Sequence, residues 1–203
     1  MIFPGDRKFP VVGIDEAGRG PWAGPVSLAA VSVPREFDLN LDELRDSKKL
    51  SPIKREKWYL WLRKAKKEKR LDFEVALVGE KLIDNLGLSR AISLGLEKLI
   101  TRLNPKPESH FFLDGGLYLP KKIKNQITII KGDEKNPIIA LASIAAKVSR
   151  DTKMISLSES WPQYGFRKNK GYGTAEHIEA LDKHGPCPSH RFSFAPVKKR
   201  LKP

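Results

Sequence analysis

Apolar and polar residues alternate along the first part of the chain in a pattern that predicts two strands and a helix. Residues 9–16 and 25–33 are short runs rich in Val, Ile and Ala, and the Gly- and Pro-rich stretch AGRGPWAG separates them. Such runs, bounded by turn residues, predict two paired strands around a structured loop. Further along, Ser51 suits an N-cap, Pro52 suits the first helical position, and apolar residues then recur at helical spacing. We expect a basic amphipathic helix there.

The middle of the chain continues this alternation. Residues 71–79 alternate as a strand does, and residues 89–103 place their apolar side chains on one helical face. Residues 108–116 and 126–133 are short apolar runs, and we interpret each as a strand that carries an Asp at its C-terminal end. Residues 137–155 begin with Pro and are apolar on nearly every side, which predicts a buried helix. This order predicts an α/β fold in which helices flank a mixed sheet.

The last part of the chain has a different composition. Residues 161–203 mix aromatic residues, glycines and cations around one short helix near 174–183, and they could form a small subdomain or a binding flap. A chain of 203 residues with 40% hydrophobic content is long enough for a substantial core, and one domain is the expected organisation. We therefore expect a single domain over 1–203, with a small C-terminal helical extension from about residue 161.

The charge of the chain narrows the choice of partners. The sequence has 38 Lys and Arg against 24 Asp and Glu, a formal net charge of +14. This balance favours a polyanionic partner, either nucleic acid or an anionic membrane surface, and charge alone does not choose between them.

Cysteine content and hydropathy narrow the compartment. A single Cys187 forms no internal disulfide, and the sequence has no Cys/His pattern typical of a zinc site. Residues 1–10 lack the apolar stretch of a signal peptide, and no run approaches the roughly 18 apolar residues of a membrane span. We expect a soluble cytoplasmic protein without membrane contact.

Four acids lie near the ends of predicted strands or beside apolar segments: Asp15, Glu16, Asp114 and Asp133. Burying a carboxylate is costly unless it is paired, hydrogen-bonded or bound to metal. Mg²⁺ and Mn²⁺ prefer oxygen ligands, and two such ions about 3.5–4 Å apart assist phosphodiester hydrolysis. The alternative is that each Asp caps a helix or begins a turn beside glycine, which is the commoner fate of an isolated Asp-Gly pair. The set of four, rather than any one acid, favours a metal site.

Six blocks of the sequence contain these acids and the glycine-rich loop: GIDEAGRGPWAGPV, DSKKLSPIKRE, FFLDGG, KGDEKNPIIALASIAAKVSRD, NKGYGTAEH and GPCPSHRFSF. In this order and spacing, from about Val12 to Val197, the chain resembles the ribonuclease HII family, the type 2 ribonucleases H. The resemblance implies a ribonuclease H-like fold and a nuclease that uses Mg²⁺ or Mn²⁺, with two ions during catalysis.

The resemblance also implies the substrate. The expected reaction is hydrolysis of the RNA strand of RNA·DNA hybrids and incision 5′ of single ribonucleotides embedded in duplex DNA, leaving 3′-hydroxyl and 5′-phosphate ends. The expected role is the removal of misincorporated ribonucleotides, carried out by a monomer.

The same resemblance assigns roles to the acids. Asp15, Glu16 and Asp114 are similar to the family's metal-binding carboxylates, and Asp133 in the KGD block is similar to the fourth acid of the active site. Asp151 is the alternative for that fourth position, but it could instead pair with a neighbouring cation. We assign Asp133 to the site and treat Asp151 as structural.

Residues that recognise the ribonucleotide are also implied. Gly18, Arg19 and Gly20 are similar to a family element that contacts the ribonucleotide 2′-hydroxyl and the adjacent phosphate; the 2′-hydroxyl distinguishes RNA from DNA. Tyr172 in GYGT is similar to a tyrosine that stacks on the deoxyribose after the ribonucleotide. Its alternative is a core tyrosine, but the glycines on either side of it favour an exposed ring.

Cations and a hydroxyl are candidates for holding the DNA backbone without reading its sequence: Ser47, Lys48, Lys49, Lys147 and Arg191. Each is alternatively a solvated surface residue. His190 could be taken for a general base, but a two-metal mechanism does not require one, and we treat His190 as structural.

Two other functions remain open from the sequence. A non-catalytic nucleic-acid-binding protein would use the positive charge alone and would bind without metal. Another metal nuclease on the same kind of fold, such as a resolvase or an integrase-like enzyme, would cut substrates that contain no ribose. The Gly-Arg-Gly and GYGT elements argue against the second alternative.

Overall fold

The protein folds around a mixed five-stranded sheet. The structure, a computed structural model, describes residues 9–34 and 50–201. The strands lie in the order β3-β2-β1-β4-β5, and the antiparallel pairs β1/β2 and β2/β3 join the parallel pairs β1/β4 and β4/β5. The predicted mixed sheet is therefore confirmed. The strand bounds are β1 Val11–Ala17, β2 Val26–Val33, β3 Asp72–Val78, β4 His110–Asp114 and β5 Gln126–Ile129.

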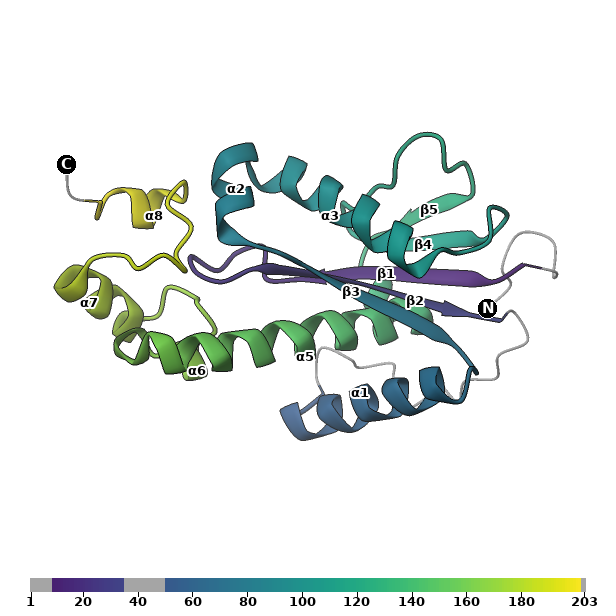
Figure 1. The fold of residues 1–203 in the computed structure, drawn as a ribbon, viewed down its shortest axis with the longest axis horizontal. Coiled ribbons are helices and arrows are strands. Elements are labelled where there is room, and N and C mark those ends of the chain that lie inside the picture. The colour runs from purple at the N-terminus through teal and green to yellow at the C-terminus, as the bar shows by residue number, and fades with distance from the viewer. Residues whose placement is uncertain (1–8, 35–49, 202–203) are drawn as a thin grey trace.

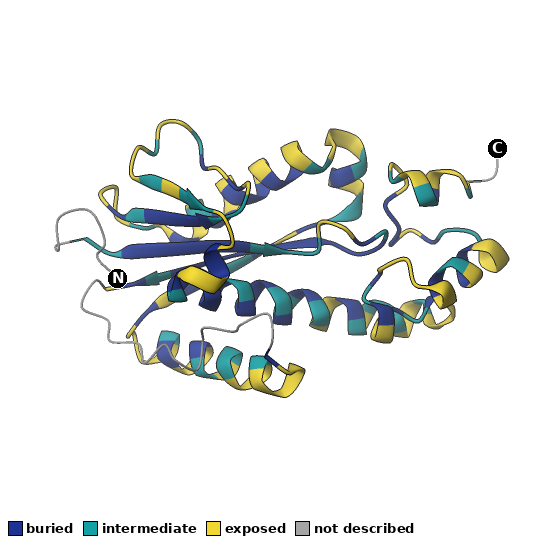
Figure 2. Ribbon diagram, turned by 180° about the vertical axis from the view of Figure 1, so that it is seen from behind, coloured by how far each residue is buried: buried dark blue, intermediate teal, exposed yellow. Residues whose placement is uncertain are grey.

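Helices cover both faces of the sheet, as Figure 1 shows. One face packs against α1 (Pro52–Lys67) and α5 (Pro137–Ser160), and the other against α2 (Glu80–Leu86) and α3 (Leu88–Leu103). The side chains of alternate strand residues enter these two layers, so the sheet is buried on both faces (Figure 2). The core therefore has two apolar layers, one on each side of the sheet.

Helix α1 begins where its capping signal predicts. The Ser51 hydroxyl accepts a hydrogen bond from the Lys54 N–H at 3.3 Å, and Pro52 occupies the first turn. Leu62 and Ala65 are buried against α5 and β3, while the opposite side of the helix is exposed (Figure 2). The predicted basic amphipathic helix is confirmed.

Helix α5 lies unusually close to the central strand because Gly13 has no side chain. A Cβ at Gly13 would lie 2.4 Å from the Ile138 carbonyl carbon, inside van der Waals contact. The Asn136 side chain caps the helix by accepting from the Ile138 N–H at 2.9 Å. This contact places the following turns of α5 directly beside the C-terminal end of β1.

The C-terminal part of the chain packs on the far half of α5. Its elements are η2 Pro162–Tyr164, α6 Phe166–Asn169, α7 Ala175–His184 and α8 Ala195–Lys198. The predicted helix near 174–183 corresponds to α7, and the shorter elements were not predicted. A third apolar cluster joins this part to α5 and to the β1–β2 loop. Backbone hydrogen bonds reinforce the contact, from Trp22 N–H to Gly171 O and from Gly24 N–H to Ser189 O, both 2.8 Å.

Two details differ from the predicted elements. Strand β5 ends at Ile129, and Asp133 lies in the short helix α4 (Gly132–Lys135) rather than at a strand end. The short helix α2 precedes α3 and was not predicted. Within residues 9–34 and 50–201, no helix combines the length and the hydropathy that crossing a membrane requires.

Candidate active site

The sheet register brings Asp15 and Asp114 together. Strands β1 and β4 run parallel with Ile14 opposite Leu113, so the next residue of each strand, an Asp in both cases, lies beside the other. Alternation of side chains turns both acids toward the face covered by α5. There Ser143 forms a side-chain hydrogen bond with Asp15. The two strand-end acids predicted from the sequence are therefore neighbours.

Burial and like charge make this group electrostatically strained. Asp15 is 3% exposed, and burial raises its pKa well above the ordinary value, with further contributions from the charges of Glu16 and Asp114. Burial also raises the pKa of Glu16, and Arg19, whose Nη1 lies 3.2 Å from Glu16 Oε1, opposes that shift. Glu16 Oε2 is buried and has no hydrogen-bond partner within the described residues. The group therefore has a negative charge that its surroundings compensate incompletely.

The KGD segment, residues 131–133, follows β5 and lies beside the carboxylate group. The Gly132 N–H donates to Asp114 Oδ1 at 2.6 Å, and the adjacent Asp133 is buried. Asp151 instead accepts from Lys147 Nζ at 2.9 Å on the surface of α5. The structure thus places the Asp133 segment beside Asp114, and Asp151 makes the ion pair considered for it from the sequence.

The donor set fits a hard divalent cation. Its atoms are carboxylate oxygens, and Mg²⁺ and Mn²⁺ prefer such ligands. Among the residues that the structure describes, Glu16 Oε2 is buried without a hydrogen-bond partner. In the conformation described over 9–34 and 50–201, no three His, Cys, Asp or Glu side chains already stand in an arrangement that would hold an ion. In this conformation Arg19 bonds Glu16 Oε1, and the Gly132 N–H bonds Asp114 Oδ1.

A cleft of about 310 Å³ lies beside the carboxylates. It brings together residues from the β1 end, the glycine-rich loop, α1, α5 and the C-terminal extension: Glu16, Ala17, Gly18, Arg55, Ser143, Ile144, Lys147 and Tyr172. Sequence reasoning missed Arg55, whose Nη1 donates to the Leu50 carbonyl at 2.5 Å. Its position on the basic helix α1 was the available signal, because such a helix beside an acidic site can meet a phosphate backbone.

Arg191 shapes the glycine-rich loop rather than the cleft surface. It is fully buried, and its guanidinium donates to the carbonyls of Gly18 (2.6 Å), Arg19 (2.8 Å) and Gly24 (2.8 and 3.0 Å). Burial and nearby Arg150 lower its pKa to about 10, so it stays charged at neutral pH. This geometry corrects our expectation that Arg191 contacts the DNA backbone, because its donors are already used inside the protein.

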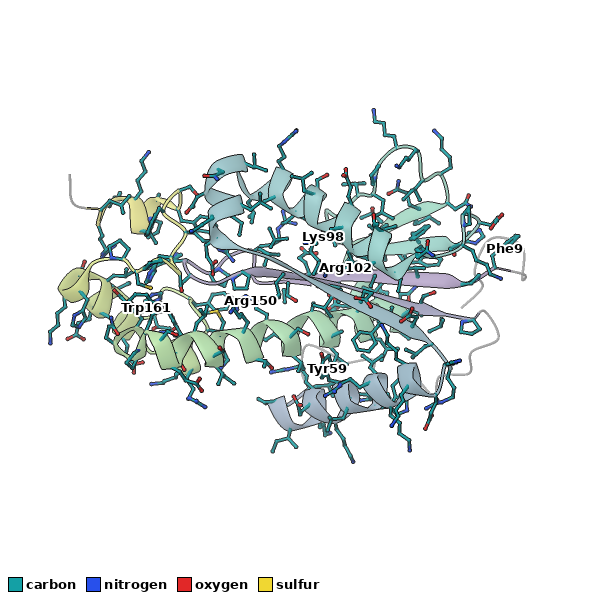
Figure 3. All side chains as sticks on the ribbon, viewed as in Figure 1. Phe9, Tyr59, Lys98, Arg102, Arg150 and Trp161 are labelled. Atoms are coloured by element: carbon teal, nitrogen blue, oxygen red, sulfur yellow. The ribbon has the colours of Figure 1, made fainter. Side chains whose placement is uncertain are left out.

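Arg150 is a second buried arginine, and sequence reasoning missed its role. It donates from Nε to Pro25 O at 3.0 Å and from Nη2 to Ala23 O and Lys170 O at 3.2 and 2.9 Å. Figure 3 shows it between α5 and the loop that joins β1 to β2. The sequence around Arg150, with other charged residues on the same helix, gave no signal for these contacts.

Gly18 allows this close packing. It has a φ of +97°, and a Cβ there would lie 2.0 Å from Arg150 Nε. A residue with a side chain would therefore meet both backbone strain and a clash. Of the three residues of the Gly-Arg-Gly element, Gly18 is thus needed for the shape of the loop itself.

Tyr172 lies beside the same loop with its ring partly in solvent. The residue is 47% exposed, which confirms the expected exposed ring, and a Cβ on Gly20 would lie 3.9 Å from its Cε1. The Arg150 guanidinium lies 5.9 Å from the centre of the ring. Gly20 and Tyr172, separated by about 150 residues of sequence, therefore form one edge of the site.

The remaining candidates fall into two groups. Lys147 lines the cleft while paired with Asp151. Ser47, Lys48 and Lys49 lie outside the described residues. His190 is buried behind the loop, away from the cleft lining, in agreement with a structural role.

Comparison with known proteins gives consistent matches. A family model described as Ribonuclease HII matches residues 12–197. The chain is 45% identical to a ribonuclease HII of Endomicrobium trichonymphae over 97% of this chain and 93% of that protein, and 46% identical to one of Caldicellulosiruptor bescii over 91% and 85%. The crystal structure of ribonuclease H2 from Pyrococcus horikoshii OT3 superposes with a TM-score of 0.71 at 29% identity, covering 94% of this chain and 96% of that one.

Proposed function

The chain belongs to the ribonuclease HII family, whose members are endonucleases acting on RNA·DNA hybrids, and we propose that it also incises duplex DNA 5′ of a single embedded ribonucleotide. The proposed ligands for two divalent cations are Asp15, Glu16, Asp114 and Asp133. The proposed products are 3′-hydroxyl and 5′-phosphate ends, and the proposed role is the removal of misincorporated ribonucleotides.

The observation that carries this proposal is the uncompensated carboxylate group at the end of β1 and β4. Three acids interact there, and burial together with mutual repulsion raises the pKa of Asp15 well above its ordinary value. A fold keeps such a group when a bound cation or a reaction requires it, because a passive nucleic-acid-binding surface gains nothing from buried negative charge. The opening of this group into the same cleft as Tyr172 favours an enzyme over a binding protein.

The neighbouring residues suit ribonucleotide recognition. The Gly18–Gly20 backbone forms a rigid edge because Arg191 fixes two of its carbonyls, and Arg19 extends from it with partial exposure. In our proposal this edge contacts the 2′-hydroxyl and its phosphate, while the Tyr172 ring stacks on the sugar that follows. Lys147 and Arg55 line the cleft and would hold phosphates without reading sequence.

In the proposed mechanism, no protein side chain needs to act as a general base. When bound, divalent cations supply a nucleophile at neutral pH and stabilise the charge on the leaving oxygen. The carboxylates hold and orient, the glycine-rich loop selects ribose, and the cations on α1 and α5 position the duplex. The buried residues His177 and His190 lie outside the cleft lining, and in our proposal neither transfers a proton in the reaction.

The test compares cleavage of a DNA duplex containing one ribonucleotide, an all-DNA duplex and a continuous RNA·DNA hybrid, with Mg²⁺, with Mn²⁺ and with chelator. We expect metal-dependent incision at the ribonucleotide and in the hybrid, and none in all-DNA. Asp114→Asn should abolish turnover while sparing most of the charge-driven affinity.

Matched variants separate the alternatives. Asp133→Asn should be as inactive as Asp114→Asn, whereas Asp151→Asn should keep most of its activity. Cleavage of all-DNA would indicate a less selective nuclease. The absence of cleavage with either metal, together with intact binding, would favour a passive binding protein.

A further inference from the structure

Two histidines of the C-terminal extension form a chain of hydrogen bonds that ends on the backbone of Tyr172. The Cys187 N–H donates to His190 Nδ1 at 2.9 Å, and His190 Nε2 lies 3.0 Å from His177 Nε2. His177 Nδ1 in turn lies 2.9 Å from the Tyr172 carbonyl oxygen. Both histidines are buried, so solvent does not replace these partners.

The positions of the protons follow from the first link of the chain. A backbone N–H always donates, so His190 Nδ1 accepts and the His190 ring proton lies on Nε2. The Cys187 carbonyl, 3.2 Å from that same nitrogen, accepts from the His190 backbone N–H at 2.9 Å. His190 Nε2 then donates to His177 Nε2, which leaves the His177 proton on Nδ1, where it donates to Tyr172. One arrangement of two protons satisfies all four ring nitrogens.

Tyr172 needs such a fixed point because glycines flank it. A Cβ at Gly171 would lie 2.4 Å from Ala23 O, and one at Gly173 would lie 2.2 Å from the Trp22 ring. The backbone therefore passes so close to the β1–β2 loop that neither glycine position has room for a side chain. Glycines on both sides give the backbone more freedom than other residues would. The His177 bond to the Tyr172 carbonyl, together with the Thr174 N–H bond to the same oxygen at 2.8 Å, limits that freedom.

We propose that His177 and His190, as this ordered neutral pair, are positioning residues that orient Tyr172 for recognising the junction between the ribonucleotide and the following deoxyribonucleotide. The inference rests on the junction role given to Tyr172 in the proposed function. His177 lies beside the β1–β2 loop as well as beside Tyr172, since its ring centre lies 6.0 Å from that of Trp22 and its Nδ1 bonds the Tyr172 carbonyl.

The surroundings keep both rings neutral. The groups packed around them are aromatic or uncharged: Tyr164 from η2, Phe166 from α6, Trp22 from the β1–β2 loop and the Cys187 backbone. Burial lowers the pKa of His177, and burial together with His177 lowers the pKa of His190 to about 4. A second proton on His177 would set two N–H groups against each other across 3.0 Å, and a second proton on His190 would face the Cys187 N–H across 2.9 Å, so the pair is intact at neutral pH and breaks in acid.

A matched pair of substitutions separates the two bonds of His177. His177→Asn keeps an N–H donor near the Nδ1 position and so keeps the bond to Tyr172, whereas His177→Gln keeps an acceptor for His190 and loses that bond. The measurement is the ratio of initial rates on the single-ribonucleotide duplex and on a continuous RNA·DNA hybrid, which has no junction at the cleavage site. We expect the ratio to fall roughly five- to tenfold in His177→Gln, the range of one lost hydrogen bond. It should change less than about twofold in His177→Asn, which keeps that bond.

Tyr172→Ala provides the reference. In that background His177→Gln should leave the ratio unchanged, because the residue that it positions is missing. Equal loss on both substrates, or a further fall of the ratio in the Tyr172→Ala background, would overturn the inference. An unchanged ratio in Tyr172→Ala alone would instead refute the junction role of Tyr172 within the proposed function, and the inference would fall with it.

A second measurement needs no variant. In ¹⁵N-histidine-labelled wild-type protein near pH 7, NMR should show His190 protonated at Nε2 and His177 at Nδ1. The opposite tautomers, or a doubly protonated ring, would contradict the hydrogen-bond chain even if every substituted protein failed to fold.

Discussion

The carboxylate group and the glycine-rich loop lie side by side, yet they treat buried charge in opposite ways. Asp15 and Glu16 are pushed toward their neutral forms by burial and by repulsion, and Glu16 Oε2 has no hydrogen-bond partner within the described part of the chain. Arg191 is fully buried, but its guanidinium makes four hydrogen bonds to three backbone carbonyls. The negative charge of the acids is thus incompletely compensated within the described residues, whereas the Arg191 guanidinium is hydrogen-bonded to the backbone.

This difference separates residues that act on a ligand from residues that build the surface for it. A buried charge whose partners are all internal fixes shape, and here it holds the backbone that would approach a ribose. A buried charge without such partners stores a cost that a bound cation relieves. Burial alone therefore does not distinguish the two cases.

The strongest test of this distinction removes one of the acids. Asp15→Asn should reduce turnover by more than about a hundredfold, at least the loss typical of residues that support a metal site. In chelator the same substitution should raise the melting temperature, because it removes one of three mutually repelling charges. Steady-state hydrolysis and thermal unfolding measure the two effects.

Asp72→Asn is the matched control, because Asp72 is paired with Lys66 at 2.8 Å on β3. Asp72→Asn should neither cause this loss of turnover nor raise the melting temperature in chelator. A lower melting temperature for Asp15→Asn in chelator would show that the acid group is structurally satisfied.

The second test removes the arginine that holds the loop. Arg191→Met leaves three carbonyls without their donor and should lower the free energy of unfolding by about 3 kcal/mol. Chemical denaturation measures this loss, and Arg63→Met on the exposed face of α1 is the control with the same chemical change. A change of stability as small as that of the control would mean that the loop does not depend on Arg191.

A third test uses the opposite pH dependences of histidines and acids. The folded-state pKa values of His177 and His190 lie below the ordinary value of 6.5, so their contribution to stability is complete above about 6.5 and is lost toward pH 4. Asp15 and Glu16 have raised pKa values, so their ionisation reduces stability as pH rises and this loss is recovered as pH falls. The two effects oppose each other in acid.

Asp15→Asn removes part of the opposing effect. In chelator, the acid-side loss of stability should become steeper, by at most about 1.4 kcal/mol per pH unit for one group. Urea titrations between pH 4.5 and 7 measure the slopes. Parallel curves for wild type and variant would contradict the raised pKa of Asp15.

The smallest expected effect concerns Lys147. Its pairing with Asp151 already neutralises part of its charge, so Lys147→Met should weaken duplex binding only about two- to threefold. The logarithmic salt slope of binding should fall by about one if Lys147 contacts a phosphate. Fluorescence anisotropy with the Asp114→Asn protein measures both, and an unchanged salt slope would exclude that contact.

The sequence predicted the carboxylate group well because its signal is local. An apolar strand that ends in an acid is visible in a few residues, and parallel pairing of β1 with β4 then makes Asp15 and Asp114 neighbours. The segment of Asp133 lies beside Asp114 through the Gly132 N–H, but Asp133 itself is in a helix and not at the predicted strand end. Lys131 adopts a φ of +54° after β5, and the chain turns into α4 before it reaches Asp133.

The loop supports were beyond sequence reasoning because their partners are distant. Arg191 bonds carbonyls about 170 positions earlier in the chain, and Arg150 bonds others about 125 positions earlier. Nothing in the composition around either arginine indicates these contacts. Backbone carbonyls are present at every position, so sequence patterns carry no information about which of them a guanidinium meets.

Helix α5 sets the spacing between the carboxylate group and the glycine-rich loop. Ser143, Lys147, Arg150 and Met154 recur every three or four residues and therefore form one stripe along the helix. At 1.5 Å per residue, the stripe spans roughly 16 Å from the acid partner to the loop supports. One inserted residue between Ser143 and Arg150 would rotate the two ends by about 100° relative to each other. The number of residues in this segment thus fixes the distance between the carboxylate group and the glycine-rich loop. An insertion or deletion here would disrupt their relative placement, whereas one in a surface loop would not.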